Sequence, residues 1–295
     1  MKLTEYSRQG RLMAARLLKA LVFSTLSWVS PLAALAGPYP PAAGEPGSTA
    51  VAANDVAIVG WADGFENYLA GSNVSPEFQT PAKALGVAGS SDGAGPDYNF
   101  DIVSLGRGGS ITLTFTVPIG NGIGHDLCVF ENSFSGTFLE LAWVEVSSDG
   151  VNFARFEGAS FTQNPVSAFG AVDPTDINGF AGKYAGGFCT PFDLSDLGAP
   201  AGVDLNRISH VRIIDIIGDG SVSDNLAPPF GPNPVYDPYP TDISAGFDLD
   251  AVAIFYFADA VTEANVPIPG PWLIVLAIIF LGVSLKGRRV QAEAI

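Results

Sequence analysis

Short runs in which apolar and polar residues alternate recur through the middle of the chain. The clearest is Ser110–Val117, in which Ile111, Leu113, Phe115 and Val117 fall on one face of an extended segment. Runs with strand character also occupy residues 127–130, 142–147, 151–156, 210–217 and 247–257. The chain therefore predicts an all-β core.

The segments between these runs contain turn residues rather than helical periodicity. Ser148-Asp149-Gly150 predicts a hairpin turn, because glycine accepts the positive φ that tight turns require. Only single helical turns are expected, at residues 81–85 and 193–197. Since no linker or repeat divides residues 54–260, we expect one antiparallel β-sandwich of the jelly-roll type. A Pro-, Gly- and Ala-rich stretch, residues 37–53, precedes it and is expected to be a flexible leader.

Both ends of the chain have the character of targeting segments. Residues 1–36 combine a basic beginning, the apolar run 20–29 and the small-residue ending Ala34-Leu35-Ala36, which predicts a signal peptide. Residues 271–285 are apolar and precede Lys286, Arg288 and Arg289. This pattern predicts a single C-terminal membrane helix with its basic end in the cytoplasm. We expect an exported protein of the cell envelope or surface, anchored by that helix before any processing.

The C-terminal segment resembles a known sorting signal. Val266-Pro-Ile-Pro269, the apolar helix and the terminal basic cluster are similar to the PEP-CTERM signal, which implies processing by an exosortase-type enzyme. The resemblance covers residues 266–290, and Ile268 stands where that family usually has Glu. Membrane anchoring depends less on that position than cleavage does.

Four blocks in the middle of the chain resemble a family of bacterial cell-surface proteins that often carry such tails. They are residues 104–115, 129–132, 144–153 and 246–252. The Ser-x-Asp-Gly-x-x-Phe hairpin and the closing Phe247-Asp-Leu-Asp250 strand are also similar to galactose-binding-like jelly rolls. Likeness of fold does not by itself identify a ligand.

The charge of the predicted domain excludes one class of partner. The chain has 14 basic and 30 acidic residues. The first 36 residues hold five basic and one acidic residue, and residues 286–295 hold three and one, so six basic and 28 acidic residues remain between them. A surface this negative repels nucleic acid and attracts cations.

Two groups of carboxylates are candidates for binding. Asp248 and Asp250 are two apart on a predicted strand, so both point to one face, and Asp63 and Glu66 follow the first strand. These four are the predicted ligands of a structural Ca²⁺, which prefers oxygen ligands. The alternative is that they are solvated or paired with arginine. A second set consists of candidate residues for ligand binding, carboxylate, amide or aromatic in character: Glu131, Asn132, Glu140, Trp61 and Tyr236.

Other chemistry is sparse in the sequence. It has two histidines, His125 and His210, and none of the usual nucleophile, phosphate-binding or zinc motifs, so we predict no enzyme. Cys128 and Cys189 are expected in an oxidising compartment, where they either form a disulfide or remain buried thiols.

The sequence thus predicts a Ca²⁺-stabilised adhesion or matrix module that binds a glycan or another surface partner. Two alternatives remain open: a structural envelope protein without a ligand, and a polysaccharide-acting hydrolase or lyase.

Overall fold

The computed structural model describes residues 36–89 and 101–259. The predicted signal peptide, apart from Ala36, lies outside the described residues, as do the membrane helix and the sorting signal. The described residues up to Phe257 belong to one compact unit. They are mostly strands and loops, as predicted, and their helical elements are short 3-10 turns. Two of these turns, η2 (Pro81–Ala84) and η4 (Leu194–Leu197), coincide with the two predicted single turns.

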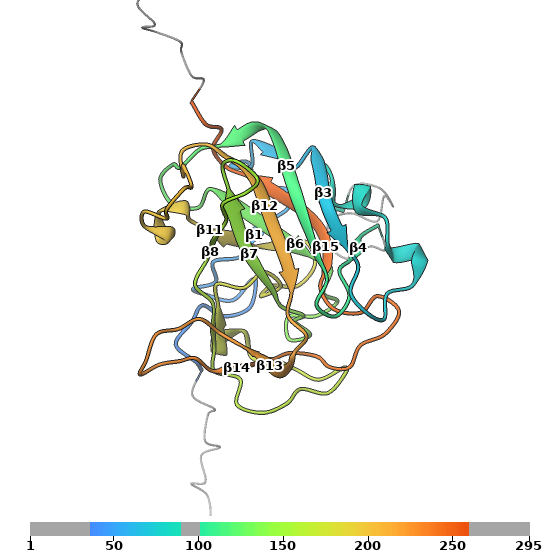
Figure 1. Ribbon diagram of the computed structural model, residues 1–295. Helices are drawn as coiled ribbons and strands as arrows, with labels where there is room; N and C mark the ends of the chain where they lie inside the picture. Colours follow the sequence, from blue (N-terminus) through green and yellow to red (C-terminus); the bar gives the residue numbers. More distant parts are fainter. Residues whose placement is uncertain (1–35, 90–100, 260–295) are drawn as a thin grey trace, which may run out of the picture. The chain divides into compact units, whose positions relative to one another are not determined.

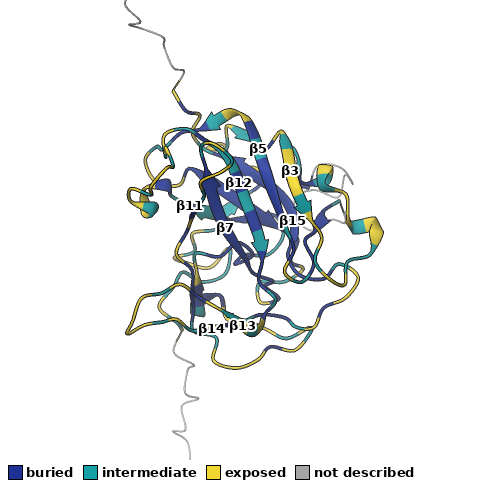
Figure 2. Cartoon of the chain, in the orientation of Figure 1, coloured by how far each residue is buried: buried dark blue, intermediate teal, exposed yellow. Residues whose placement is uncertain are grey.

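One sheet is antiparallel and has the strand order β3-β5-β12-β7-β8. Its strands are β3 (Gly64–Leu69), β5 (Ser110–Ile119), β12 (Ile208–Asp215), β7 (Ala142–Ser147) and β8 (Ala154–Arg155). Every residue of the interior strand β7 is buried, whereas β3 at the edge is largely exposed (Figure 2). The edge strand presents Glu66 and Asn67 to solvent together with the apolar side chains of Phe65 and Leu69.

The second sheet is also antiparallel and has the order β1-β11-β6-β15-β2, with β4 pairing with β15 as well. Its strands are β1 (Val51–Ala52), β11 (Phe188–Phe192), β6 (Leu127–Glu131), β15 (Asp248–Ile254), β2 (Gly60–Trp61) and β4 (Val103–Ser104). In Figure 1, β5, β12 and β7 lie in front of the strands of this second sheet.

The main hydrophobic core joins the two sheets. Alternate residues of one sheet, such as Leu113 and Val144, belong to the same buried cluster as Val129 and Val252 of the other. Their alternation along each strand explains the period of two in the sequence. Val117 is an exception to the predicted face, because it is half exposed. At that point β5 has passed the end of its pairing with β3, and the register with β12 is irregular.

The hairpin between β7 and β8 forms at the predicted turn, but its second strand is short. Asp149 accepts hydrogen bonds from the backbone N–H groups of Val151 and Asn152, both at 2.8 Å. These residues consequently turn around the aspartate instead of joining the ladder. The predicted strand 151–156 is reduced to β8, and Gly150 takes a φ of 73°.

Residues 37–53, predicted as a flexible leader, are packed in the structure. The N–H of Gly37 donates to Thr175 Oγ1 at 2.7 Å, and the ring of Tyr39 stacks on Phe161. Val51–Ala52 then pairs with β11 as the edge strand β1. Composition alone missed this, because backbone pairing and ring stacking do not require a hydrophobic run.

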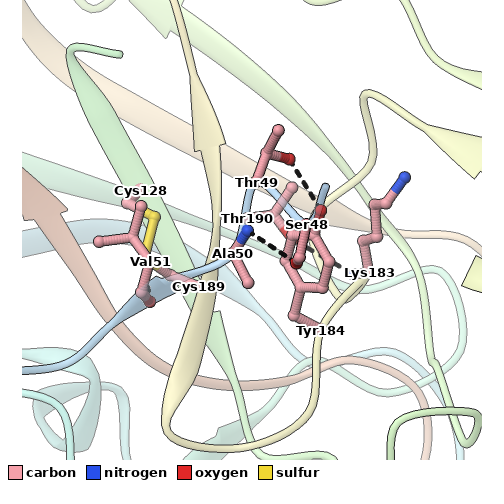
Figure 3. The surroundings of a disulfide bond; sticks show 9 residues. All are labelled: Ser48, Thr49, Ala50, Val51, Cys128, Lys183, Tyr184, Cys189 and Thr190. Carbon is pink, nitrogen blue, oxygen red and sulfur yellow. Dashed lines mark hydrogen bonds between the residues drawn. A yellow bond between two sulfur atoms is a disulfide. The ribbon is translucent and has the colours of Figure 1, made fainter. Parts of the chain in front are cut away.

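A disulfide joins Cys128 of β6 to Cys189 of β11, two adjacent strands (Figure 3). Close to it, the hydroxyl groups of Thr49 and Tyr184 share a 2.8 Å hydrogen bond. The disulfide joins two residues that are 61 positions apart in the sequence, so it restricts the unfolded chain strongly.

Smaller elements complete the described part of the chain. They are the pairs β9 (Ala159–Ser160) with β10 (Ile177–Asn178) and β13 (Asp219–Ser223) with β14 (Pro234–Tyr236), and the turns η1 (Pro76–Phe78) and η3 (Pro174–Asp176). A second apolar cluster lies among these pairs, with Trp143 of β7 packed edge-on against Phe180 at 4.8 Å. The loop that follows β6 and the loop that precedes β15 supply most of the candidate site.

Candidate functional site

Two neighbouring strands of the second sheet bring acidic residues together where one strand ends and the other begins. Strand β6 ends at Glu131, and its antiparallel neighbour β15 begins at Asp248. The N–H of Asn132 donates to the carbonyl of Asp248 at 3.1 Å, which holds the two strand ends side by side. Antiparallel pairing thus joins two acidic groups that are 117 positions apart in the sequence.

A pocket of about 180 Å³ opens at these strand ends. Its polar lining consists of Glu131, Asn132, Glu140, Thr241, Asp242, Ser244 and Asp248. The loop after β6 and the loop before β15 supply most of these residues, and Glu140 comes from the segment that leads into β7. The pocket therefore depends on three segments that meet only in the folded chain.

Hydrogen bonds hold two of the acids in place. The hydroxyl of Thr241 donates to Glu140 Oε1 at 2.8 Å, while its oxygen accepts from the N–H of Gly246 at 3.1 Å. Ser104 of β4 donates its hydroxyl to Asp248 Oδ1. Glu131 differs, because its Oε2 is buried and has no hydrogen-bond partner in the described part of the chain.

Burial raises the pKa of the carboxyls of Glu131, Glu140 and Asp248, and repulsion from neighbouring carboxylates adds to it for the two glutamates. Burial raises the pKa of Glu131 and of Glu140 well above the ordinary range, and the charge of Asp248 raises both further. Burial also raises the pKa of Asp248 to about 7, although hydrogen bonds from Ser104 and Ser244 act in the opposite direction. The pocket therefore favours a proton or a cation near these oxygens.

Three phenylalanines lie along the rim of the same pocket. The rings of Phe134 and Phe138 stack with centroids 4.4 Å apart, and Phe138 stacks on Phe169 at 6.2 Å. Phe138 is buried, whereas 55% of Phe134 and 83% of Phe169 are exposed. Two exposed rings beside a polar pocket form an apolar platform, which is unusual on a solvated surface and typical of a binding site.

The structure separates the predicted calcium ligands. Asp248 lines the pocket, but Asp63 and Glu66 do not. Asp63 is exposed and accepts two hydrogen bonds from the N–H of Thr116, at 3.0 and 3.1 Å. Glu66 is exposed on β3, next to Asn67 and 3.8 Å from His210. The predicted grouping of Asp63 and Glu66 with the two aspartates is therefore not formed.

Asp250 is buried near the pocket but faces another partner. Both of its oxygens accept from the N–H of Gly89, at 3.1 and 3.0 Å. The register between β15 and β6 shifts between Leu249 and Ala251, which places this aspartate at an irregularity of the ladder. Its charge still contributes to the raised pKa of Glu131.

The second predicted set is divided in the same way. Glu131, Asn132 and Glu140 line the pocket together with Asp248, so the two acidic groups of the sequence form one site. Trp61 packs on Phe130 with ring centroids 5.6 Å apart, and Tyr236 packs against the second apolar cluster. Neither aromatic residue lies on the pocket, so both act in packing.

Sequence reasoning missed the phenylalanine platform. The signal was present in Asn132-Ser-Phe-Ser-Gly-Thr-Phe138, in which aromatic residues stand in a Ser- and Gly-rich loop with no strand pattern to bury them. Thr241 and Ser244 could not be found by pattern, because they lie in a loop that reaches the acids only through tertiary contacts.

Two features are absent from the described residues. Among residues 36–89 and 101–259, no three His, Cys, Asp or Glu side chains are already grouped as a metal site. Within the same segments, no helix has the length and apolar character needed to cross a membrane. Comparison with known proteins found no matching family model and no matching curated protein.

Proposed function

We propose that this chain is an exported cell-surface protein whose β-domain binds carbohydrate at the acidic pocket and its phenylalanine platform. The observation that carries this proposal is that two exposed rings, each stacked on the buried Phe138, lie beside a pocket of carboxylate, amide and hydroxyl groups. Each half of that arrangement matches one half of a sugar.

The platform suits the apolar face of a sugar ring. One face of a pyranose presents C–H groups, which lie against an aromatic ring with little loss of hydration. Phe138 supports Phe134 and Phe169 by stacking between them, so the platform has a buried anchor. The loop that carries it is held by hydrogen bonds of its own, since the N–H of Phe138 donates to Ser135 Oγ at 3.0 Å. A platform that is ordered in advance costs little entropy on binding.

The pocket suits the hydroxyl groups of the same ligand. Asn132 both donates and accepts, while the exposed carboxylate of Asp242 accepts from sugar hydroxyls. Asp242 is 66% exposed at its side chain and lies at the rim, where it is paired with Arg107 at 3.2 Å. Because the lining is acidic, neutral glycans fit it better than uronic acids or sulfated sugars.

Export is the second part of the proposal. It is supported by the signal-peptide pattern of residues 1–36, by the C-terminal signal at 266–290, and by the disulfide between Cys128 and Cys189. Disulfides persist mainly outside the cytoplasm. The resemblance to PEP-CTERM proteins adds the expectation that an exosortase-type enzyme processes the tail, and that the helix 271–285 holds the protein in the membrane until then.

The fold is proposed to be a jelly-roll sandwich of the galactose-binding-like type. Two antiparallel sheets share one core, and non-consecutive strands are neighbours in both, which supports this assignment. In such folds the loops at the strand ends carry ligands, and the acidic pocket lies at the ends of β6 and β15.

The binding experiment uses the full chain, purified in detergent and applied to an array of neutral glycans. The wild type is expected to bind at least one class, and the double variant Phe134→Ala/Phe169→Ala to bind it about tenfold more weakly, because two stacking surfaces are lost. Phe230→Ala is the matched control, since Phe230 is also exposed but lies off the pocket. Absence of glycan binding by the wild type, or equal binding by the double variant, would contradict the proposal and leave a structural envelope protein.

Hydrolysis of the bound glycan is the second candidate, favoured by buried carboxyls with raised pKa values beside a sugar platform. Against it, the side chains of Glu131 and Glu140 are almost entirely buried, which limits their reach to a glycosidic oxygen. Incubation of the bound glycan with the full chain, followed by analysis of reducing ends, distinguishes the two functions. Release that is lost in Glu140→Gln would identify an enzyme.

A further inference from the structure

The acids of the pocket differ from the other buried glutamate of the domain in their partners. Glu145 on β7 is also buried, and it is paired with Arg155 at 2.7 Å and with Arg212 across the strand. Buried carboxylates ordinarily have such partners. In the described residues, no ion pair includes Glu131, Glu140 or Asp248.

The basic residues of the domain are few and are engaged elsewhere. Between residues 37 and 285 the chain has only Lys83, Arg107, Arg155, Lys183, Arg207 and Arg212, and all six lie in the described segments. Arg107 approaches the pocket most closely, but its guanidinium contacts Asp242 and the carbonyl of Thr241 and lies over the ring of Tyr239. Lys183 donates to the carbonyl of Ile177 at 2.6 Å. Among the described residues, no basic side chain is therefore paired with Glu131, Glu140 or Asp248, whereas Asp242 at the rim is paired with Arg107.

A second, independent observation points to a ligand at the same place. Glu131 is only 2% exposed and lines the pocket. Backbone N–H groups of Asn132 and Ser133 act on its carboxyl, but its buried Oε2 has no hydrogen-bond partner among the described residues. A buried carboxylate oxygen without a partner is costly and is rare in folded proteins. An atom bound in the pocket would supply what the chain does not.

Oxygen is the only ligand chemistry at this site. Among the described residues, the pocket is lined by no cysteine or histidine, and its polar lining is the carboxylates of Glu131, Glu140, Asp242 and Asp248, the amide of Asn132 and the hydroxyl groups of Thr241 and Ser244. Hard cations prefer such ligands, and Ca²⁺ tolerates irregular sets of six to eight oxygens better than Mg²⁺ does. The small volume of about 180 Å³ also suits an ion with some bound water.

We propose that the pocket floor binds one divalent cation of the Ca²⁺ type through Glu131, Glu140 and Asp248, with neutral oxygens from the surrounding loops. The three acids line one pocket, but in the described residues as they stand no three such side chains are arranged to hold a metal ion, so binding requires the carboxylates to move towards the cation. The site differs from the one the sequence predicts, because it keeps Asp248 but has Glu131 and Glu140 in place of Asp250, Asp63 and Glu66. Cation binding does not depend on a carbohydrate ligand, since the protein itself supplies all the proposed ligand residues.

Calcium titration of the metal-stripped full chain by isothermal calorimetry tests this inference without any glycan. The wild type is expected to bind one Ca²⁺ per chain, and Glu131→Gln to bind it at least about tenfold more weakly, because one charged ligand is lost. Glu66→Gln is the matched control: it removes the same charge from an exposed site that the sequence predicts as a ligand, and it should bind as the wild type does.

Glu131→Gln keeps the size of the side chain, so thermal melting should show that it folds. If it does not, Asp248→Asn replaces it in the same titration. No binding by the wild type would overturn the proposal and leave the three carboxyls sharing protons. Binding unchanged in Glu131→Gln and in Asp248→Asn, or lost equally in Glu66→Gln, would overturn it too.

Discussion

The hydroxyl of Thr241 donates to Glu140 Oε1 across 2.8 Å, and this single bond connects two segments that are 101 residues apart in the sequence. It ties the loop before β15 to the residue that leads into β7. Both residues are buried, and the same hydroxyl oxygen also accepts from the N–H of Gly246. The bond therefore holds one wall of the acidic pocket against another.

Replacing Thr241 by Val tests how much this bond stabilises the domain. The change preserves shape but leaves the carboxyl of Glu140 and the N–H of Gly246 without a partner, so we expect the free energy of unfolding to fall by about 1–3 kcal/mol. Denaturant unfolding of the full chain measures the difference. Thr162→Val is the matched control, because the hydroxyl of Thr162 is buried without a partner and its removal should be neutral. Equal losses in both variants would show that the Thr241 bond has no special weight.

Gly182 lies directly against the backbone of Glu140, which makes it a second test of the pocket wall. It has a φ of +86°, and a Cβ built there would lie 1.9 Å from the carbonyl oxygen of Glu140. Gly86 has a similar φ of +82° but nothing within 4 Å. We expect Gly86→Ala to cost about 1–2 kcal/mol from backbone strain alone, and Gly182→Ala a further 1–3 kcal/mol or so from the clash.

Melting temperatures of the two glycine variants separate the contributions, since backbone strain is common to both. Gly182→Ala should also weaken Ca²⁺ binding by the full chain, because it displaces the segment that carries Glu140. Similar melting temperatures for the two variants would mean that the Glu140 segment moves aside without cost.

Asp215 predicts an unusual dependence of stability on pH. Burial raises its pKa from 3.8 to about 7, although the N–H groups of Gly108 and Phe247 donate to it. Between those two values the native chain keeps a proton that the unfolded chain has released. The contribution of Asp215 to the free energy of unfolding is therefore greatest below about pH 4. This contribution falls as the pH rises towards 7, by at most about 1.4 kcal/mol per pH unit.

Urea unfolding at several pH values, in the presence of a chelator, measures this slope. Asp215→Asn should make it shallower, because one titrating group is removed. Asp219→Asn should leave it unchanged between pH 4 and 7, since hydrogen bonds from Ser221 lower the pKa of Asp219 and it titrates below that range. A slope that Asp215→Asn does not alter would show that Asp215 is ionised in the native state throughout.

Local pattern was sufficient for the strands themselves. Ser110–Val117 alternates because one side of β5 packs on the core, and β12 has the same cause. Strands β6, β7 and β15 are buried at every residue, so short apolar runs mark them instead. The turn at Gly150 was equally accessible, since a positive φ there is a local requirement. Edge strands such as β1 were missed because backbone pairing alone stabilises them, and pairing leaves no hydrophobic pattern.

The sequence by itself determined the all-β class, the excess of acid and the identity of most of the pocket acids. Only the tertiary structure decided which of them meet. Glu131 and Asp248 become neighbours because β6 and β15 pair antiparallel, while Asp63 is captured by the backbone of Thr116 on the other sheet. The phenylalanine platform was likewise decided by folding, because Phe169 reaches Phe138 through a loop contact. Register and loop packing depend on long-range contacts, and residue spacing along the chain carries no record of them.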